Sequence, residues 1–215
     1  QNLYSEKMLP VTNFFLPGIV FLYQGQEIGM RDDPKQSIQG FVDKPTFAIY
    51  DRLIAEGKTD AEALEQINRE SREHSRTPMQ WDDSTNAGFS SAPASDLYIT
   101  MDPGKDRPTA KAQMADPDSL YHEVKKLIQI RQSSKALLSR GTIEFVYAEK
   151  NQYPLAYVRE AEGEKVLVII NPSDKEQSFP YSAELKDALY TIGGKAESKD
   201  GTITIPAQSA GFYHI

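Results

Sequence analysis

The sequence has no cysteine, only three histidines and a single tryptophan among its 215 residues. Without cysteine the chain forms no disulfide bond, no thiolate metal site and no cysteine nucleophile. A cytoplasmic location fits this composition, because disulfides are rare in that reducing compartment. The histidines, His74, His122 and His214, are scattered without the spacing of metal ligands. We therefore expect no metal site and no other cofactor.

The chain also lacks a long apolar run and a cluster of positive charge. Its most apolar stretch, Met8–Tyr23, is broken by two prolines, an asparagine and a glycine, whereas a membrane-spanning helix needs roughly 18 consecutive apolar residues. Acidic residues outnumber basic ones by 31 to 24, and no run of lysine or arginine is present. We expect neither a membrane nor a nucleic acid as a partner.

An apolar segment near the N-terminus leads into a polar one. Ile19–Tyr23 is apolar at every position, which is typical of a strand buried on both faces of a parallel sheet. The polar residues Gln24–Glu27 follow at once. In parallel α/β folds the functional groups gather at the carboxyl ends of the strands. The pattern therefore predicts a buried strand that ends at a polar site.

Two helices and a long loop are predicted in the middle of the chain. Thr59 and Glu62 have the spacing of a capping box, which predicts a helix that begins beside them. Asp116–Pro117 has the pattern of an N-cap followed by proline and predicts a second helix start. That helix is expected to end between Ser133 and Leu138. About 30 residues before it lack periodicity, and loops of that length are usually functional or disordered.

From Gly141 onward the pattern changes to short strands separated by turn residues. Strands at a spacing of roughly 8–12 residues favour a β-sandwich. We place the domain boundary near Ser139–Arg140, which gives domains of residues 1–139 and 140–215. The expected strands are Gly141–Tyr147, Leu155–Val158, Val166–Ile170, Leu189–Ile192, Thr202–Ile205 and Gly211–Ile215.

Two motifs carry a specific resemblance. Gly18–Met30 and Ser71–Asp82, the latter continuing to Asn86–Phe89, resemble the eighth barrel strand and the following loop of glycoside hydrolase family 13. The branch they resemble holds the oligo-1,6-glucosidases, dextran glucosidases and α-glucosidases of this α-amylase superfamily. Asp116–Arg131 resembles the last barrel helix, and the β-rich tail resembles the C-terminal domain. The implied fold class is the α/β remnant of the last part of a (β/α)8 TIM barrel followed by an all-β sandwich.

The resemblance implies an activity for a larger enzyme. A complete barrel takes about 250 residues, which residues 1–139 do not supply. In the family the nucleophile Asp, the acid/base Glu and a stabilising Asp lie on earlier barrel strands. We therefore expect the C-terminal segment of a retaining α-glucosidase that hydrolyses terminal α-glucosidic bonds of oligosaccharides. The segment alone is expected to be inactive, with no catalytic residue of its own, and to self-associate through exposed barrel edges.

Four residues are candidates for contact with an α-linked gluco-oligosaccharide. Arg76 offers a fixed fork of donors that suits sugar hydroxyls, and the resemblance implies that it recognises the non-reducing-end glucose; the alternative is a solvent-exposed arginine in a charged loop. Tyr23 and Gln24 are expected to line or support the pocket floor. Glu27 could be a catalytic carboxylate, but we favour a role in ordering its loop by accepting backbone N–H bonds.

Three further residues are expected to support the site. Arg72 is interpreted as structural, and Asp82 as a loop and turn ligand. Trp81 could stack on a sugar ring, but a buried anchor with its N–H satisfied is favoured. Phe89 and Tyr98 fit an aromatic rim of the pocket and core packing equally well.

The sequence departs from the family pattern in the loops that shape the aglycone side. Val20 stands where a proline is usual, Arg31–Asp32 where Thr-Asn is common, and Ser91–Ala94 where Pro-Trp is expected. These departures leave the exact substrate open, and trehalose synthase and sucrose isomerase relatives stay possible. A stand-alone carbohydrate-binding or interaction module is the alternative from another class, although the tail shows no cluster of aromatic residues.

Overall fold

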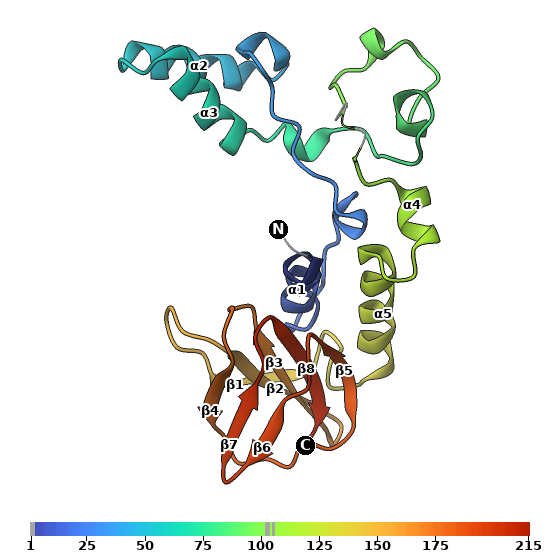
Figure 1. The fold of residues 1–215 in the computed structure, drawn as a ribbon, viewed down its shortest axis with the longest axis vertical. Coiled ribbons are helices and arrows are strands. Elements are labelled where there is room, and N and C mark those ends of the chain that lie inside the picture. The colour runs from blue at the N-terminus through green and yellow to red at the C-terminus, as the bar shows by residue number, and fades with distance from the viewer. Residues whose placement is uncertain (1–2, 102–103, 105) are drawn as a thin grey trace. The chain divides into compact units, whose positions relative to one another are not determined.

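The computed structural model describes residues 3–101, 104 and 106–215 (Figure 1). The chain forms two compact units. The sandwich unit combines the residues up to Leu22 with Asp118–Ile215, and the loop–helix unit is Tyr23–Pro117. The division into domains at residue 139 stays a prediction.

The sandwich unit contains two antiparallel sheets (Figure 1). One has the strand order β1-β2-β3-β8-β5, and the other the order β4-β7-β6. Their facing sides share an apolar core that includes Leu167, Ile169, Phe179 and Ile203. The strands are β1 (Thr142–Tyr147), β2 (Leu155–Ala161), β3 (Glu164–Asn171), β4 (Gln177–Pro180), β5 (Ala188–Ile192), β6 (Glu197–Lys199), β7 (Thr202–Ile205) and β8 (Ser209–His214).

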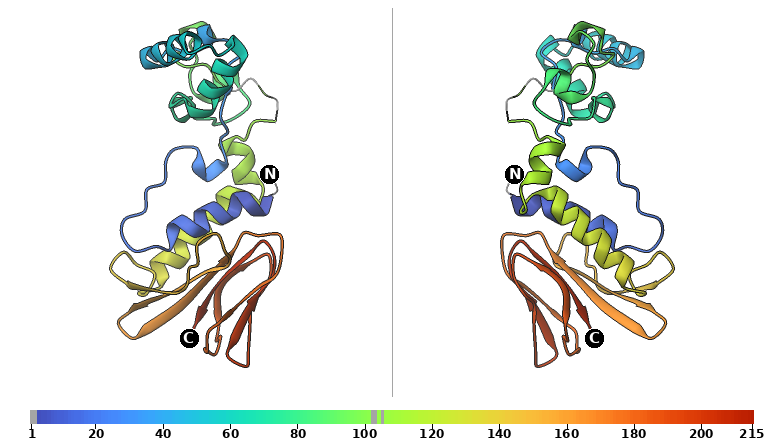
Figure 2. Two further views of the ribbon diagram at one scale, coloured as in Figure 1. Left: turned by 90° about the vertical axis from the view of Figure 1, so that its left-hand side faces the viewer. Right: turned by 90° about the vertical axis from the view of Figure 1, so that its right-hand side faces the viewer.

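Two helices cover the other face of the five-stranded sheet (Figure 2). They are α1 (Leu3–Phe14) and α5 (Leu120–Ser133), and their core with the sheet includes Val11, Leu127 and Phe212. The unit therefore has three layers, in the order helices, sheet and sheet. Because both faces of β3 are covered, its side chains from Val166 onward are all buried, which explains an apolar run without alternation.

All six predicted strands are present, and two further strands were missed. β4 and β6 have four and three residues, and every residue of β6 is exposed. Short polar strands at the edge of a sheet give no apolar pattern that could be found in the sequence.

The predicted start of the last helix is wrong by several residues. Asp116 ends a short helix, α4 (Ala110–Ala115), because its backbone N–H donates to Ala112 O. Helix α5 begins at Leu120, and Ser119 is its N-cap, with a hydroxyl that accepts from the N–H of His122. The end of α5 at Ser133 agrees with the prediction.

The loop–helix unit contains the hairpin of α2 (Lys44–Ala55) and α3 (Asp60–Glu70). The two helices pack around a small core that includes Phe41, Leu53 and Ile67. The predicted capping box is confirmed, because Glu62 Oε2 accepts from Thr59 N at 2.9 Å and the Thr59 hydroxyl accepts from Glu62 N. The rest of the unit is loop with short 3-10 turns at Gln26–Ile28, Ile38–Gly40, His74–Arg76, Thr85–Gly88 and Ala94–Asp96.

The predicted buried strand at Ile19–Tyr23 is wrong for this chain. The segment has no regular secondary structure, and the side chains of Ile19 and Phe21 are more than four-fifths exposed. A parallel strand needs neighbouring strands and covering helices. Within the described part of the chain, every strand belongs to the antiparallel sheets of the sandwich, so no strand pairs with this segment.

Among the helices of the described residues, none is both long and apolar enough to cross a membrane.

Candidate functional site

A polar cavity of about 330 Å³ lies within the loop–helix unit. It is lined by three segments: residues 23–26, residues 30–32 and most of residues 69–77. Two of these segments are the ones that the sequence motifs single out. Tyr23 and Gln24 line the cavity together with Ser75 and Thr77, the two neighbours of Arg76. The structure therefore brings the Tyr23–Gln24 and Arg76 motifs together.

The turn after Tyr23 is held tightly. Gln26 Oε1 accepts from Tyr23 N at 2.9 Å, and Gly25 O accepts from Met30 N at 2.9 Å. Gly25 has a φ of 87°, and a Cβ atom there would lie 2.4 Å from Met30 Sδ. Glycine is therefore required, both for its backbone conformation and for its lack of a side chain. The side chain that orders this turn is Gln26, whereas Glu27, for which that role was expected, is half-buried and does not line the cavity.

Arg76 lies at the end of the 3-10 turn His74–Arg76. Its backbone N–H donates to Glu73 O at 2.9 Å, and its side chain is exposed. Arg76 itself is not among the residues that line the cavity, although its neighbours Ser75 and Thr77 are. Its exposed guanidinium is available to donate hydrogen bonds to a ligand.

Arg72 forms a two-pronged ion pair with Asp43, next to the start of α2. Arg72 Nε lies 2.5 Å from Asp43 Oδ2, and Arg72 Nη2 lies 2.7 Å from Asp43 Oδ1. The hydrogen bonds from Arg72 lower the pKa of the Asp43 carboxyl, and the nearby charge of Arg76 adds to this. This placement supports the interpretation of Arg72 as structural.

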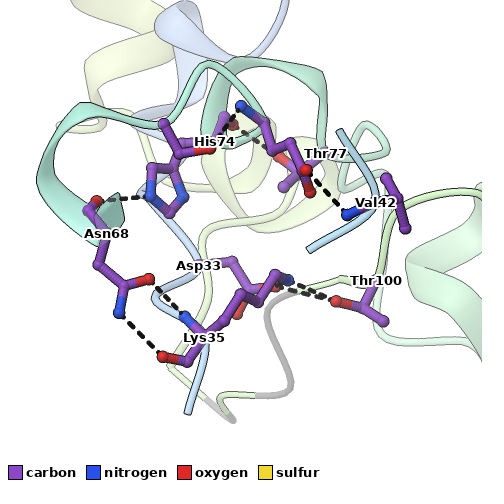
Figure 3. Close-up of polar contacts among 9 residues, drawn as sticks. Asp33, Lys35, Val42, Asn68, His74, Thr77 and Thr100 are labelled. Carbon is purple, nitrogen blue, oxygen red and sulfur yellow. Dashed lines mark hydrogen bonds and ion pairs between the residues drawn. The ribbon is translucent and has the colours of Figure 1, made fainter. Parts of the chain in front are cut away.

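Glu73 is a buried carboxyl that the sequence reading missed. It is 2% exposed, and its Oε1 accepts from Val42 N at 2.8 Å and from Asp43 N at 2.5 Å. Figure 3 labels Val42, one of the two residues whose backbone N–H donates to this carboxyl. Between Arg72 and His74 the residue looks like part of a solvated polar stretch, so no sequence signal marks it as buried.

A second missed cluster holds another part of the unit together (Figure 3). Lys35 Nζ donates to Asp33 Oδ2 and to Thr100 Oγ1, and Lys35 and Asp33 are both buried. The side chain of Asn68 bonds both backbone groups of Lys35, at 2.8 and 2.9 Å. His74 Nε2, from a residue that lines the cavity, lies 2.6 Å from Asn68 O. These contacts join the end of α3 to the loop before α2.

Trp81 is not the buried anchor that was expected. Its side chain is 52% exposed. The backbone does the anchoring instead, because Trp81 N donates to Ala87 O at 2.8 Å and Trp81 O accepts from Lys111 N at 2.9 Å. Asp82 is a turn ligand: hydrogen bonds from the hydroxyl and backbone of Ser84 lower the pKa of its carboxyl.

The other aromatic and histidine candidates are less informative. Phe89 and Tyr98 are 50% and 72% exposed, so neither packs in a core. His214 pairs with Glu164 in the sandwich unit, with Nε2 and Oε1 3.1 Å apart. No cluster of metal-ligating side chains occurs within the residues that the structure describes.

The cavity carries both signs of charge. Arg31 and Arg69 line it together with Asp32 and Glu70, alongside amide and hydroxyl groups. Such a lining offers donors and acceptors in near balance, which suits a neutral ligand rich in hydroxyl groups better than an ion of one sign.

Comparison with known proteins places the chain in a family. The model for the α-amylase catalytic domain matches residues 1–141. The chain belongs to the α-amylase family. A second model, for the C-terminal domain of the α-amylase SusG, matches residues 155–210 of the sandwich. The fold class is therefore a remnant of the family's catalytic domain followed by an antiparallel β domain, as the resemblance implied.

Glucosidases and a trehalulose synthase are among the proteins that this chain resembles. An oligo-1,6-glucosidase of Parageobacillus thermoglucosidasius is 36% identical over 81% of this chain and 30% of its own length. A glucan 1,6-alpha-glucosidase of Streptococcus pneumoniae is 28% identical over 86% of this chain and 34% of its own. The crystal structure of a trehalulose synthase from Pseudomonas mesoacidophila is 28% identical, with a TM-score of 0.84 over 98% of this chain and 38% of that one. This chain thus spans about a third of the relatives it matches.

Proposed function

We propose that this chain is the C-terminal segment of a retaining α-glucosidase of the oligo-1,6-glucosidase type. The whole enzyme would hydrolyse terminal α-glucosidic bonds of gluco-oligosaccharides through a covalent glucosyl-enzyme intermediate. The observation that carries the proposal is the meeting of the Tyr23–Gln24 turn and the Arg76 loop at one polar cavity. The 36% identity to an oligo-1,6-glucosidase supports this branch of the family.

Within this proposal the chain binds sugar but does not cleave it. Arg76 recognises the glucose unit, and Tyr23 and Gln24 form the floor of the pocket. The two carboxyl groups of a retaining glycosidase must stand about 5–5.5 Å apart on either side of the bond. We assign both of them, and the stabilising Asp, to the part of the enzyme that corresponds to the relatives' N-terminal two-thirds.

A hybrid enzyme tests the proposal. It joins the N-terminal part of the Parageobacillus relative to this chain, at the point where the similarity begins. We expect the hybrid to hydrolyse isomaltose and the 215-residue chain alone to show no turnover. In the hybrid, Arg76→Ala should raise KM by about tenfold or more, because an arginine hydrogen bond to a ligand contributes about 1.5–3 kcal/mol.

Arg52→Ala is the matched control, since Arg52 is an exposed arginine on α2 that pairs only weakly with Glu56. A folded hybrid whose KM is the same with and without Arg76 would refute the role of Arg76. Turnover by the chain alone would refute the placement of the catalytic carboxyls. Binding of isomaltose by the chain alone, without turnover in any hybrid, would instead favour a carbohydrate-binding module.

A second candidate is the isomerisation of sucrose. It is favoured by the fold likeness to the trehalulose synthase, at a TM-score of 0.84, and by the departures Arg31–Asp32 and Ser91–Ala94 from the glucosidase pattern. Sucrose supplied to the hybrid separates the two candidates: a glucosidase releases glucose and fructose, and an isomerase yields a rearranged disaccharide.

Two further proposals concern the surroundings of the chain. We infer a cytoplasmic location from the absence of cysteine. We also infer self-association through the exposed apolar segment Ile19–Leu22, whose backbone lacks strand partners among the described residues.

A further inference from the structure

Glu73 bonds to the Arg76 loop and to the start of α2 at the same time. Its backbone oxygen accepts from Arg76 N at 2.9 Å. Its side-chain Oε1 accepts from Val42 N at 2.8 Å and from Asp43 N at 2.5 Å. One residue therefore joins the short turn that carries Arg76 to a segment about 30 residues away in sequence.

Glu73 serves the backbone N–H groups just before α2. Asp43 is the N-cap of α2, and its side chain makes no capping hydrogen bond, because Arg72 holds its carboxylate. The Glu73 carboxyl instead accepts from the backbone N–H of this N-cap and of Val42 before it, near the positive end of the helix dipole. Arg72 and Glu73, adjacent in sequence, thus bind the side chain and the backbone of the same residue.

The two side-chain oxygens of Glu73 differ in their surroundings. Oε2 is buried and has no hydrogen-bond partner within the residues that the structure describes. Burying a carboxyl oxygen without a partner is unfavourable. The hydrogen bonds of Glu73 have a geometric consequence. They fix the position of the loop between Ser71 and Thr77, and hence the position of the backbone that carries the Arg76 side chain.

We propose that Glu73 is a positioning residue for Arg76, holding the Arg76 loop on the start of α2 in the geometry that binds substrate. The kinetic part of this inference rests on the proposed function, because it takes Arg76 as the group that contacts the sugar. The structural part, the tie between the loop and α2, is independent of any substrate. Neither Glu73 nor Arg76 is among the residues that line the cavity; in this proposal the exposed Arg76 reaches the sugar and the buried Glu73 acts through it.

Amide hydrogen exchange on the 215-residue chain tests the structural part. Glu73→Met keeps a similar size and removes both acceptors, whereas Glu73→Gln keeps Oε1. In Glu73→Met, peptides that cover Val42–Asp43 and Arg76 should exchange at least about tenfold faster, because the bonds that protect them open locally. Glu73→Gln should exchange as the unchanged chain does. Glu56→Gln, at the exposed C-cap of α2, is the control.

A second variant protects this test against loss of folding. Arg72 is 57% exposed on its side chain, so Arg72→Met removes the other bond to Asp43 without emptying a buried position. It should also speed exchange at Val42–Asp43, by a smaller factor. Unchanged exchange at these amides in both folded variants would overturn the proposal.

Kinetics of the hybrid enzyme test the consequence for substrate binding. Glu73→Met should raise KM by about tenfold and change kcat by less than about twofold, since a small misplacement of a binding group is enough to cost affinity. In a background of Arg76→Ala, Glu73→Met should raise KM no further, because the two residues act as one. Glu73→Gln should restore most of the affinity.

The outcomes separate the two proposals. Additive effects of Glu73→Met and Arg76→Ala on KM, or a fall in kcat with KM unchanged, would overturn the positioning role. If Arg76→Ala leaves KM unchanged while Glu73→Met still speeds the exchange at Val42 and Asp43, the proposed function of Arg76 fails and the structural tie stands.

Discussion

Replacing Arg159 by methionine should destabilise the sandwich unit. Arg159 extends from β2, is fully buried, and donates to four carbonyl oxygens, those of Phe15, Leu138, Gly141 and Thr142. These oxygens belong to the end of α1 and to the connection from α5 into β1. The arginine therefore bonds three parts of the unit together. Methionine fills a similar volume and offers none of these bonds.

The magnitude follows from two opposing effects. Each intramolecular hydrogen bond contributes about 1 kcal/mol net, so four of them are worth about 4 kcal/mol. Burial of the guanidinium opposes this, and the same burial lowers the pKa of Arg159. Removing a buried charge returns part of its desolvation cost. We expect a net loss of about 2–3 kcal/mol in the free energy of unfolding.

Urea unfolding followed by far-ultraviolet circular dichroism measures this loss. With a denaturant dependence of about 1–3 kcal/mol per molar urea, the midpoint should fall by about 1–2 M. The fluorescence of Trp81 reports the other unit and is not used for this transition. Arg140→Met is the control, because Arg140 is an exposed arginine beside the same turn. A midpoint within about 0.3 M of the unchanged chain would show that desolvation cancels the hydrogen bonds, and would refute the reasoning.

Two shorter predictions concern the same unit. Burial opposes ionisation of Glu164, but hydrogen bonds from Ala136, His214 and Ser134 hold the pKa of its carboxyl below the usual value. The stabilisation by the ionised Glu164 carboxylate should therefore be complete at neutral pH and be lost as pH falls below about 4. We expect Glu164→Gln to be about 1–2 kcal/mol less stable than the unchanged chain at pH 7 and equally stable at pH 2.5. A difference that persists at pH 2.5 would contradict this. Gly141→Ala should cost about 2–3 kcal/mol by urea unfolding, because the new Cβ would lie 2.1 Å from the backbone oxygen of Ala136. Gly163→Ala, with nothing within 4 Å, should cost only about 1 kcal/mol from its positive φ. Equal losses for the two variants would refute the clash.

Local patterns predicted the parts of the fold whose neighbours are near in sequence. The capping box at Thr59 needs only four residues, and it is present. The long strands of the sandwich were visible because each buries an apolar face. The same reasoning failed at Asp116, where a residue suited to start a helix instead ends the one before it. The helix-ending role uses the backbone N–H of Asp116 and not its side chain, and every residue except proline has such a group, so the residue type alone did not reveal it.

The sequence motifs indicated which segments meet at the cavity but not the buried residues that support them, and the roles of the site residues stay predictions. Tyr23, Gln24 and the loop of Arg76 meet at one cavity. Lys35 and Glu73 look like surface residues in the sequence, because charged side chains are mostly exposed. Their burial depends on partners that lie about 30 or more residues away. No local sequence pattern indicates hydrogen bonds between residues so far apart in the chain.

The two sequence regions that the family models match do not have separate hydrophobic cores. Helices α1 and α5 lie in the region matched by the catalytic-domain model, yet they cover the face of the five-stranded sheet that points away from the second sheet. Residues 140–215 alone would expose Val168 and Phe212, which are fully buried in the whole chain. We expect residues 140–215 alone to bind a hydrophobic dye and to unfold without a sharp transition, as loosely packed states do. Residues 118–215 should show an intermediate behaviour, because α5 restores part of the cover. Cooperative unfolding of residues 140–215 at the midpoint of the whole chain would mean that the sheet needs neither helix.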